Sequence, residues 1–128
     1  MINSIIFDTN VIVRYLVKDP PFQLIQAQRY IEKIEQGKLK GLLSVLVINE
    51  IVWVLEKYYS LKRAIYVPLL LKLLALKNIR IIEVKKNLII TALELMLRSN
   101  VDFTDAYLFC TKGDKKIFSF DEDLKKLS

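Results

Sequence analysis

Histidine is absent from this 128-residue chain, and its absence excludes several common kinds of active site. Without an imidazole there is no Ser-His-Asp or Cys-His catalysis, no histidine general base and no ordinary zinc site. The three glycines, Gly37, Gly41 and Gly113, are too scattered to form a P-loop or a dinucleotide-binding fingerprint. Any catalysis must therefore rest on other side chains.

Cysteine and long hydrophobic runs are also scarce. The single cysteine, Cys110, has no partner for an internal disulfide, so a reducing cytoplasm is the expected compartment. The most hydrophobic stretch, residues 67–76, is broken by Pro68 and Lys72 and is much shorter than a membrane span. We therefore expect a cytoplasmic protein that makes no contact with a membrane.

Basic residues outnumber acidic ones by 20 to 14, and the net charge is +6. Such an excess favours a polyanionic partner such as nucleic acid, although simple solubility explains it equally well. Hydrophobic residues make up 53% of the chain, which is enough to bury a core without disulfides or a structural metal. The expectation is one domain, residues 1–128.

Short apolar stretches alternate with segments of helical periodicity, a pattern typical of an α/β fold. No Asn-Gly hairpin signal separates the strands, so we expect right-handed crossovers and a parallel sheet with helices on both faces. The predicted strands are 4–8, 39–43, 79–84 and 116–120, and the predicted helices are 10–17, 19–37, 44–58, 61–76, 86–98, 102–112 and 124–128.

Two of the helices carry further signals. Ser44 is well placed to cap the helix that follows it. Pro68 is expected either to kink or to split the helix over 61–76. The leucines of that helix cover more than one face, which fits a subunit interface and the protein core equally well.

Carboxylates stand where two of the predicted strands end. Asp8 follows the first strand and Asp121 follows the fourth. In a doubly wound sheet these two strands can lie side by side, and both aspartates would then line one crevice at the carboxyl edge. Either residue alone would more simply be a loop-starting or helix-capping aspartate.

Three other acids are candidates for the same crevice. Asp102 and Asp105 share one face at a helix start, where Asp102 is a good N-cap; alternatively Thr104 is the cap and Asp105 points elsewhere. Glu50 lies at the border of an otherwise apolar helix, a position that is ordinarily solvated but within reach of a crevice. Converging carboxylates repel one another unless a cation lies among them, and oxygen ligands alone indicate Mg²⁺ or Mn²⁺. Such an ion suits phosphodiester hydrolysis.

The acids stand in four short motifs, whose order and separations resemble those of PIN-domain nucleases. The motifs are Phe7-Asp8-Thr9-Asn10, Asn49-Glu50-Ile51, Asp102-Phe103-Thr104-Asp105 and Ser119-Phe120-Asp121-Glu122-Asp123. The resemblance covers essentially the whole chain, whose size is typical of VapC-type toxins from prokaryotic type II toxin-antitoxin pairs. It implies that Asp8, Glu50, Asp105 and Asp121 form a metal-binding catalytic cluster. Asp102, Asp123, Thr9 and Ser119 would be auxiliary.

The resemblance also implies the rest of the expected biology. A sheet of order 3-2-1-4-5, a homodimer, Mg²⁺- or Mn²⁺-dependent RNA cleavage and neutralisation by a cognate antitoxin are the family's features. Since the chain ends at Ser128, soon after the fourth motif, the fifth strand is expected to be missing or very short. The basic residues expected to hold the RNA backbone are Arg14, Lys112, Lys115 and Lys116.

Two competing functions are less favoured. An aspartyl-phosphate phosphatase also places an aspartate after its first strand, but it needs a second acid two positions later, where this chain has Asn10. A non-catalytic module of the same fold, binding RNA or protein, is the other alternative. The presence of all four acids argues against loss of catalysis.

Overall fold

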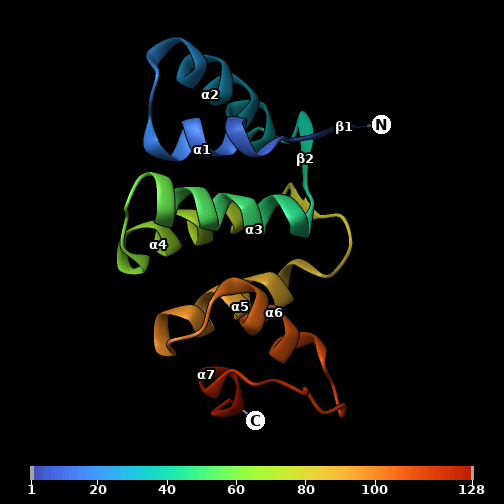
Figure 1. Cartoon of the computed structure of the whole chain (residues 1–128). Helices are drawn as coiled ribbons and strands as arrows, with labels where there is room; N and C mark the ends of the chain where they lie inside the picture. The colour runs from blue at the N-terminus through green and yellow to red at the C-terminus, as the bar shows by residue number, and fades with distance from the viewer. Residues whose placement is uncertain (1, 128) are drawn as a thin grey trace.

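A computed structural model describes residues 2–127 and shows an α/β arrangement (Figure 1). Met1 and Ser128, the two ends of the predicted domain, lie outside the described residues. The elements are β1 (Asn3–Ile6), α1 (Thr9–Val17), α2 (Pro21–Glu35), β2 (Leu39–Leu43), α3 (Val45–Trp53), the π-helical turn η1 (Val54–Tyr58), α4 (Arg63–Leu74), β3 (Ile79–Ile81), α5 (Lys86–Arg98), α6 (Phe103–Thr111) and α7 (Glu122–Lys125).

The three strands form a parallel sheet in the order β1-β2-β3. Ile5 pairs with Gly41, and Gly41 pairs in turn with Ile79. The parallel sheet and the 3-2-1 part of the predicted order are therefore confirmed. Figure 1 places β1 and β2 with α1 and α2 at one end of the molecule, α3 and α4 in the middle, and α5, α6 and α7 at the other end.

Gly41 allows α2 to lie directly on the middle of the sheet. A Cβ atom at this position would be 2.8 Å from side-chain atoms of Ile34, Ile79 and Phe7. Ile34 belongs to α2, and the other two residues belong to β3 and to the end of β1. The glycine is thus required by close packing in the core rather than by a turn.

The predicted fourth strand, 116–120, and a fifth strand do not occur among residues 2–127. Phe118 and Phe120 are 86% and 85% exposed, and their rings contact each other at 5.2 Å instead of packing against β1. Propensity alone cannot form a strand, because its stability comes from pairing and from burial against neighbours. Here the segment is held at its ends, by the Lys115–Lys112 backbone bond and by Asp121 at the start of α7.

The expectation of helices on both faces of the sheet is wrong for the face that carries Ile6. Its neighbours across the strands are Leu42 and Arg80, and Ile6 itself is 65% exposed. The opposite face, with Phe7, Leu43 and Ile81, is buried, and α2 packs there on β2. The polar residues at alternating positions of β2 and β3, such as Arg80, mark the open face.

The leucine-rich helix is mostly core. Leu70, Leu73 and Leu74 are buried, whereas Leu69 is exposed. Pro68 does not split this helix, since α4 runs continuously through it and the proline lies on the exposed side. Within residues 2–127, no helix has both the length and the apolar character that a membrane crossing requires.

A polar network joins η1, α4 and the end of α5. The Tyr66 hydroxyl, on a fully buried residue, donates to Glu56 Oε2 at 2.6 Å, and Arg63 Nε lies 3.5 Å from the same oxygen. The Arg63 guanidinium also donates to the backbone carbonyl of Val101 at 2.6 Å. Burial, followed by the hydrogen bond to Glu56, raises the pKa of Tyr66 above its usual value.

Replacing Tyr66 by phenylalanine should destabilise the fold by about 1–2 kcal/mol, because the hydrogen bond to a charged partner is lost. The pH dependence should also change. The folded-state pKa of Tyr66 is raised, so the unfolded chain loses this proton first, and wild-type stability falls as the pH rises above about 10. Urea unfolding at neutral and alkaline pH measures both effects. In Tyr66→Phe the alkaline loss should shrink.

Tyr58→Phe is the matched control, because Tyr58 is exposed. Its unfolding free energy should equal that of the wild type at both pH values. Equal stability of Tyr66→Phe and the wild type would show that the Glu56 contact contributes nothing to the fold.

Candidate active site

Two aspartates define the start of α6. Asp102 is the N-cap, and its Oδ1 accepts from the backbone N–H of Asp105 at 2.9 Å. Of the two capping arrangements open from the sequence, the structure therefore has the one with Asp102 as the cap. Asp105 lies three residues further on and is half-buried. Its side chain makes no contribution to the cap, so the helix start does not explain why this residue is acidic.

Asp121 approaches the same place from the other end of the chain. It is the N-cap of α7, where its Oδ1 accepts from Asp123 N at 2.8 Å and from Leu124 N at 3.3 Å. Ser119 Oγ in turn accepts from Asp121 N at 2.9 Å. The Asp123 carboxylate receives a longer bond, 3.4 Å, from the Asn100 amide. The Asn100 bond links the C-terminal segment to the residues that precede α6.

The carboxyl groups of Asp102, Asp105 and Asp121 form a cluster of like charges, here called the acidic cluster. Burial is the largest cause that raises the pKa of Asp105, and the charges of Asp102 and Asp121 raise it further. Hydrogen bonding to those two carboxyl groups acts in the same direction. The ionised form of Asp105 is therefore disfavoured in the folded chain.

The acidic cluster lies in a cavity of about 480 Å³ between α3, α6 and the C-terminal segment. Asn49 and Trp53 of α3 line it, as do Lys57 and Arg63. Asp123 is in the same wall. The cavity therefore combines five carboxylates, Glu56 among them, with two amides and two cations, a mixture suited to a metal ion and a phosphate together.

Asp8 lies at the start of α1 and is not part of the lining of the acidic cavity. It is exposed, follows β1, and caps α1 by accepting from Thr9 N at 2.8 Å. Thr9 is buried and is the one polar residue buried among those described. Neither residue lines the cavity of the acidic cluster. Asp8 thus lies at the carboxyl edge of the sheet, as expected, and is not among the residues that line the acidic cavity.

Glu50 is exposed on α3 and also stays outside that cavity. Its neighbour Asn49 lines the cavity instead. Residues one apart on a helix differ in direction by about 100°, so only one of the two can face α6. Of the four predicted ligands, the structure brings together Asp105 and Asp121, and it adds Asp102.

The predicted RNA-binding residues are divided between two places. Arg14 lines a different cavity, between α1 and α2. Lys112 lies at the end of α6, with its ammonium 5.6 Å from the Phe109 ring. Lys115 and Lys116 are exposed in the connection to α7. These three lysines follow the helix that carries Asp105.

Sequence reasoning missed several polar residues near the carboxyl edge. Glu83, after β3, accepts from Ser44 Oγ at 2.5 Å and from Val45 N at 2.8 Å, so it completes the cap of α3 that Ser44 begins. The hydrogen bond from Ser44 lowers the pKa of Glu83. Arg63 and Asn100 of the acidic cavity were also missed. Their partners are distant in the sequence, so no local sequence pattern could have predicted these contacts.

The donor chemistry of the acidic cluster fits a hard divalent cation, since all its donors are carboxylate oxygens. One oxygen each of Asp102 and Asp121 is committed to a helix cap, which leaves the Oδ2 atoms outside the caps. Across residues 2–127, no three potential ligands are already arranged around one point. Binding would therefore require the carboxylates to draw together.

Comparisons with known proteins identify the family. Residues 5–128 match the PIN domain family. No curated protein and no solved structure gives a significant match. PIN domains are generally nucleases, and such nucleases generally use divalent metal ions. Because the match spans nearly all of its length, the chain belongs to the PIN domain family.

Proposed function

We propose that this chain is a single-domain, metal-dependent endoribonuclease that hydrolyses RNA phosphodiester bonds. The observation that carries the proposal is the acidic cluster: Asp102, Asp105 and Asp121 share one cavity in a member of a nuclease family. Neighbouring carboxylates repel one another, and binding Mg²⁺ or Mn²⁺ between them is a role that their oxygens suit.

Asp105 is the principal ligand in this proposal, because its carboxylate has no part in a helix cap. Asp121 is the second, and Asp102 and Asp123 are auxiliary. The caps of α6 and α7 fix the backbone beneath Asp102 and Asp121, so that only side-chain movement is needed for the carboxylates to draw together around a cation. When bound, the cation lowers the pKa of a water molecule and neutralises charge on the phosphate.

Asp8 and Glu50 are proposed as further members of the site on the basis of the sequence motifs. Both are exposed and carry free carboxylate oxygens near α1 and α3. Thr9 and Ser119 would supply hydroxyl groups near the metal or the phosphate. Lys57 and Arg63 line the acidic cavity and would attract the RNA phosphates towards the carboxylates.

The cellular role is a further part of the proposal. The motif order and chain length support a VapC-type toxin that acts in the cytoplasm as a homodimer and is neutralised by a cognate antitoxin. Exposed apolar side chains on α3 and η1, namely Leu46, Trp53 and Tyr58, are available for such protein contacts.

One observation favours a second candidate, a non-catalytic binding module. Asp8, Asp102 and Asp121 each cap a helix, so their acidity has a purely structural explanation. Asp105 has no such explanation, and it separates the two candidates.

Replacing Asp105 by asparagine should reduce cleavage of a single-stranded RNA by at least about 100-fold, because loss of even an outer partner of a metal costs about 10–100-fold. The metal-free variant should be at least as stable as the wild type, since the raised pKa of Asp105 shows that its charge is disfavoured in the folded state. RNA gel assays and thermal unfolding measure the two effects.

Millimolar Mn²⁺ should raise the unfolding temperature of the wild type but not of Asp105→Asn, because a ligand stabilises only the state that binds it. Asp114→Asn is the matched control: Asp114 is exposed and outside the cavity, and its loss should change neither result. Cleavage that persists in EDTA, or in Asp105→Asn, would rule out the proposed chemistry.

Asp8→Asn tests the motif-based part of the site. Asparagine caps helices as well as aspartate does, so α1 and the unfolding temperature should be preserved. Cleavage should nevertheless fall by at least about tenfold if the lost charge belongs to the metal site. Asp19→Asn, an exposed aspartate before α2, is the control. Unchanged cleavage in Asp8→Asn would leave Asp8 with its capping role alone.

A further inference from the structure

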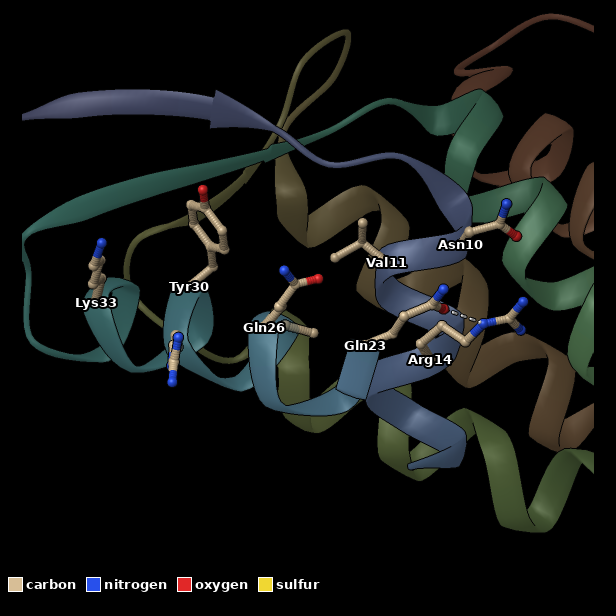
Figure 2. Close-up of a pocket in the computed structure, with 9 residues that line it drawn as sticks. Asn10, Val11, Arg14, Gln23, Gln26, Tyr30 and Lys33 are labelled. Carbon is tan, nitrogen blue, oxygen red and sulfur yellow. Dashed lines mark hydrogen bonds between the residues drawn. The ribbon is translucent and has the colours of Figure 1, made fainter. Parts of the chain in front are cut away.

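Another cavity lies between α1 and α2 (Figure 2), and none of its lining residues lines the acidic cavity. Its volume is about 680 Å³, which is in the range of small-ligand pockets. Three classes of side chain line it: basic, amide and apolar or aromatic. They are Arg14, Arg29 and Lys33; Asn10, Gln23 and Gln26; and Val11, Ala27 and Tyr30.

The charged side chains that line this cleft are all basic. Arg14, Arg29 and Lys33 line it, and no described carboxylate does. Three cations without a neutralising acid repel one another, and the concave wall concentrates their positive potential. The occupant that suits such a wall is an anion with charges spaced along its length.

Arg14 is held in one orientation at one end of the cleft. Its Nε donates to Gln23 Oε1 at 2.9 Å, the bond drawn in Figure 2, and its Nη1 donates to the Tyr59 hydroxyl at 3.0 Å. Nη2 makes no hydrogen bond to any residue from 2 to 127. A guanidinium fixed by two partners retains a donor pair that can bind a phosphate without further ordering.

Lys33 marks the other end of the cleft. Its ammonium lies 5.5 Å from the centre of the Tyr30 ring, and that ring meets Phe7 of the core edge-on at 6.4 Å. These two contacts place the Lys33 ammonium close to the wall of the α1–α2 cleft. Figure 2 shows the Tyr30, Gln26 and Val11 side chains rising from α2 and α1 between Lys33 and Arg14.

The amides give the cleft a second chemistry. Asn10, Gln23 and Gln26 each offer both donors and acceptors, and base edges present the same mixture. Such edges are accessible only in single strands, because pairing uses them in a duplex. Asn10 is two residues from Asp8, so a chain leaving the cleft at this end arrives at the carboxyl edge of the sheet.

We propose that the α1–α2 cleft binds single-stranded RNA, with Arg29 and Lys33 holding phosphates and Gln26 contacting a base. This inference rests on the proposed ribonuclease function in one respect: the bound RNA strand is taken to continue from the cleft towards Asp8. Binding itself needs neither metal nor cleavage.

A second basic cleft provides the comparison. Lys77, Arg80, Lys85 and Lys86 line a cavity of about 330 Å³ beside β3, on the other side of β2 from β1. Lys86 is already engaged there, donating to the Leu76 carbonyl at 2.9 Å. This cleft has a single amide, Asn87, and lies at the sheet edge away from Asp8. This second cleft therefore offers basic side chains but lacks the group of three amides that could bind a base.

The test measures fluorescence anisotropy of a labelled single-stranded RNA of mixed sequence, in EDTA so that no cleavage occurs. The double variant Arg29→Ala/Lys33→Ala should bind about tenfold more weakly, and its salt slope should fall by about 1.4, the value for two lost phosphate contacts. The control, Arg80→Ala/Lys85→Ala, removes the same charge and should bind within about twofold of the wild type. Arg29 and Lys33 are exposed on α2, where alanine favours the helix, so the first variant should fold.

Equal losses in the two double variants would overturn the inference, because the binding would then follow net charge alone. Displacement of the RNA by poly-glutamate at matched charge would also overturn it and identify an acidic peptide as the occupant. If wild-type protein cleaves no RNA but the first variant alone loses affinity, the proposed nuclease function fails and the cleft assignment stands. If cleavage requires Asp105 while both double variants bind RNA like the wild type, the nuclease function stands and the cleft assignment fails.

Discussion

Aspartate side chains that accept hydrogen bonds from exposed backbone N–H groups are the constraint on which this structure depends most. α1, α6 and α7 each begin at such a residue: Asp8, Asp102 and Asp121. The first turn of a helix leaves its N–H groups without backbone partners, and a carboxylate both accepts from them and complements the positive end of the helix. In this chain, three of the candidate ligands are residues that start helices, and Asp105 is the one that does not cap its helix.

Capping also bears on the repulsion within the acidic cluster. The cap bonds contribute favourable free energy at Asp102 and Asp121, which offsets part of their mutual repulsion. Asp105 has no comparable bond and carries the raised pKa. The two capping members of the acidic cluster are therefore stabilised by their cap bonds, whereas the charge of Asp105 stays disfavoured.

The α1–α2 cleft and the acidic cavity are built from different elements around the sheet. Its buried face packs on α2 through the close contact at Gly41, and this contact also sets the α2 side of the basic cleft. The acidic cavity is built from α3, α6 and the C-terminal segment instead. An RNA strand held at α1 and α2 would have to continue past the carboxyl edge, where Asp8 lies, to reach Asp105.

Sequence alone predicted the elements whose signals are local. Helical periodicity gave α5 its bounds, Ser44 was recognised as the cap of α3, and the hydrophobic strands with no hairpin signal between them led to a parallel sheet. The four acidic motifs led to the PIN domain family. Each signal depends on neighbouring residues in one stretch of chain, where spacing and capping act directly.

Only the tertiary structure decided which distant groups meet. Residues 116–120 have the composition of a strand but find no strand partner, because pairing is a contact between remote segments that composition does not specify. Asp105 lies beside Asp121, and Glu83 and Glu56 bind partners 38 and 10 residues away. The sequence by itself determined the local elements and the supply of carboxylates. The packing of helices and the sheet determined which carboxylates share a cavity, since that choice depends on the burial and charge of the whole chain.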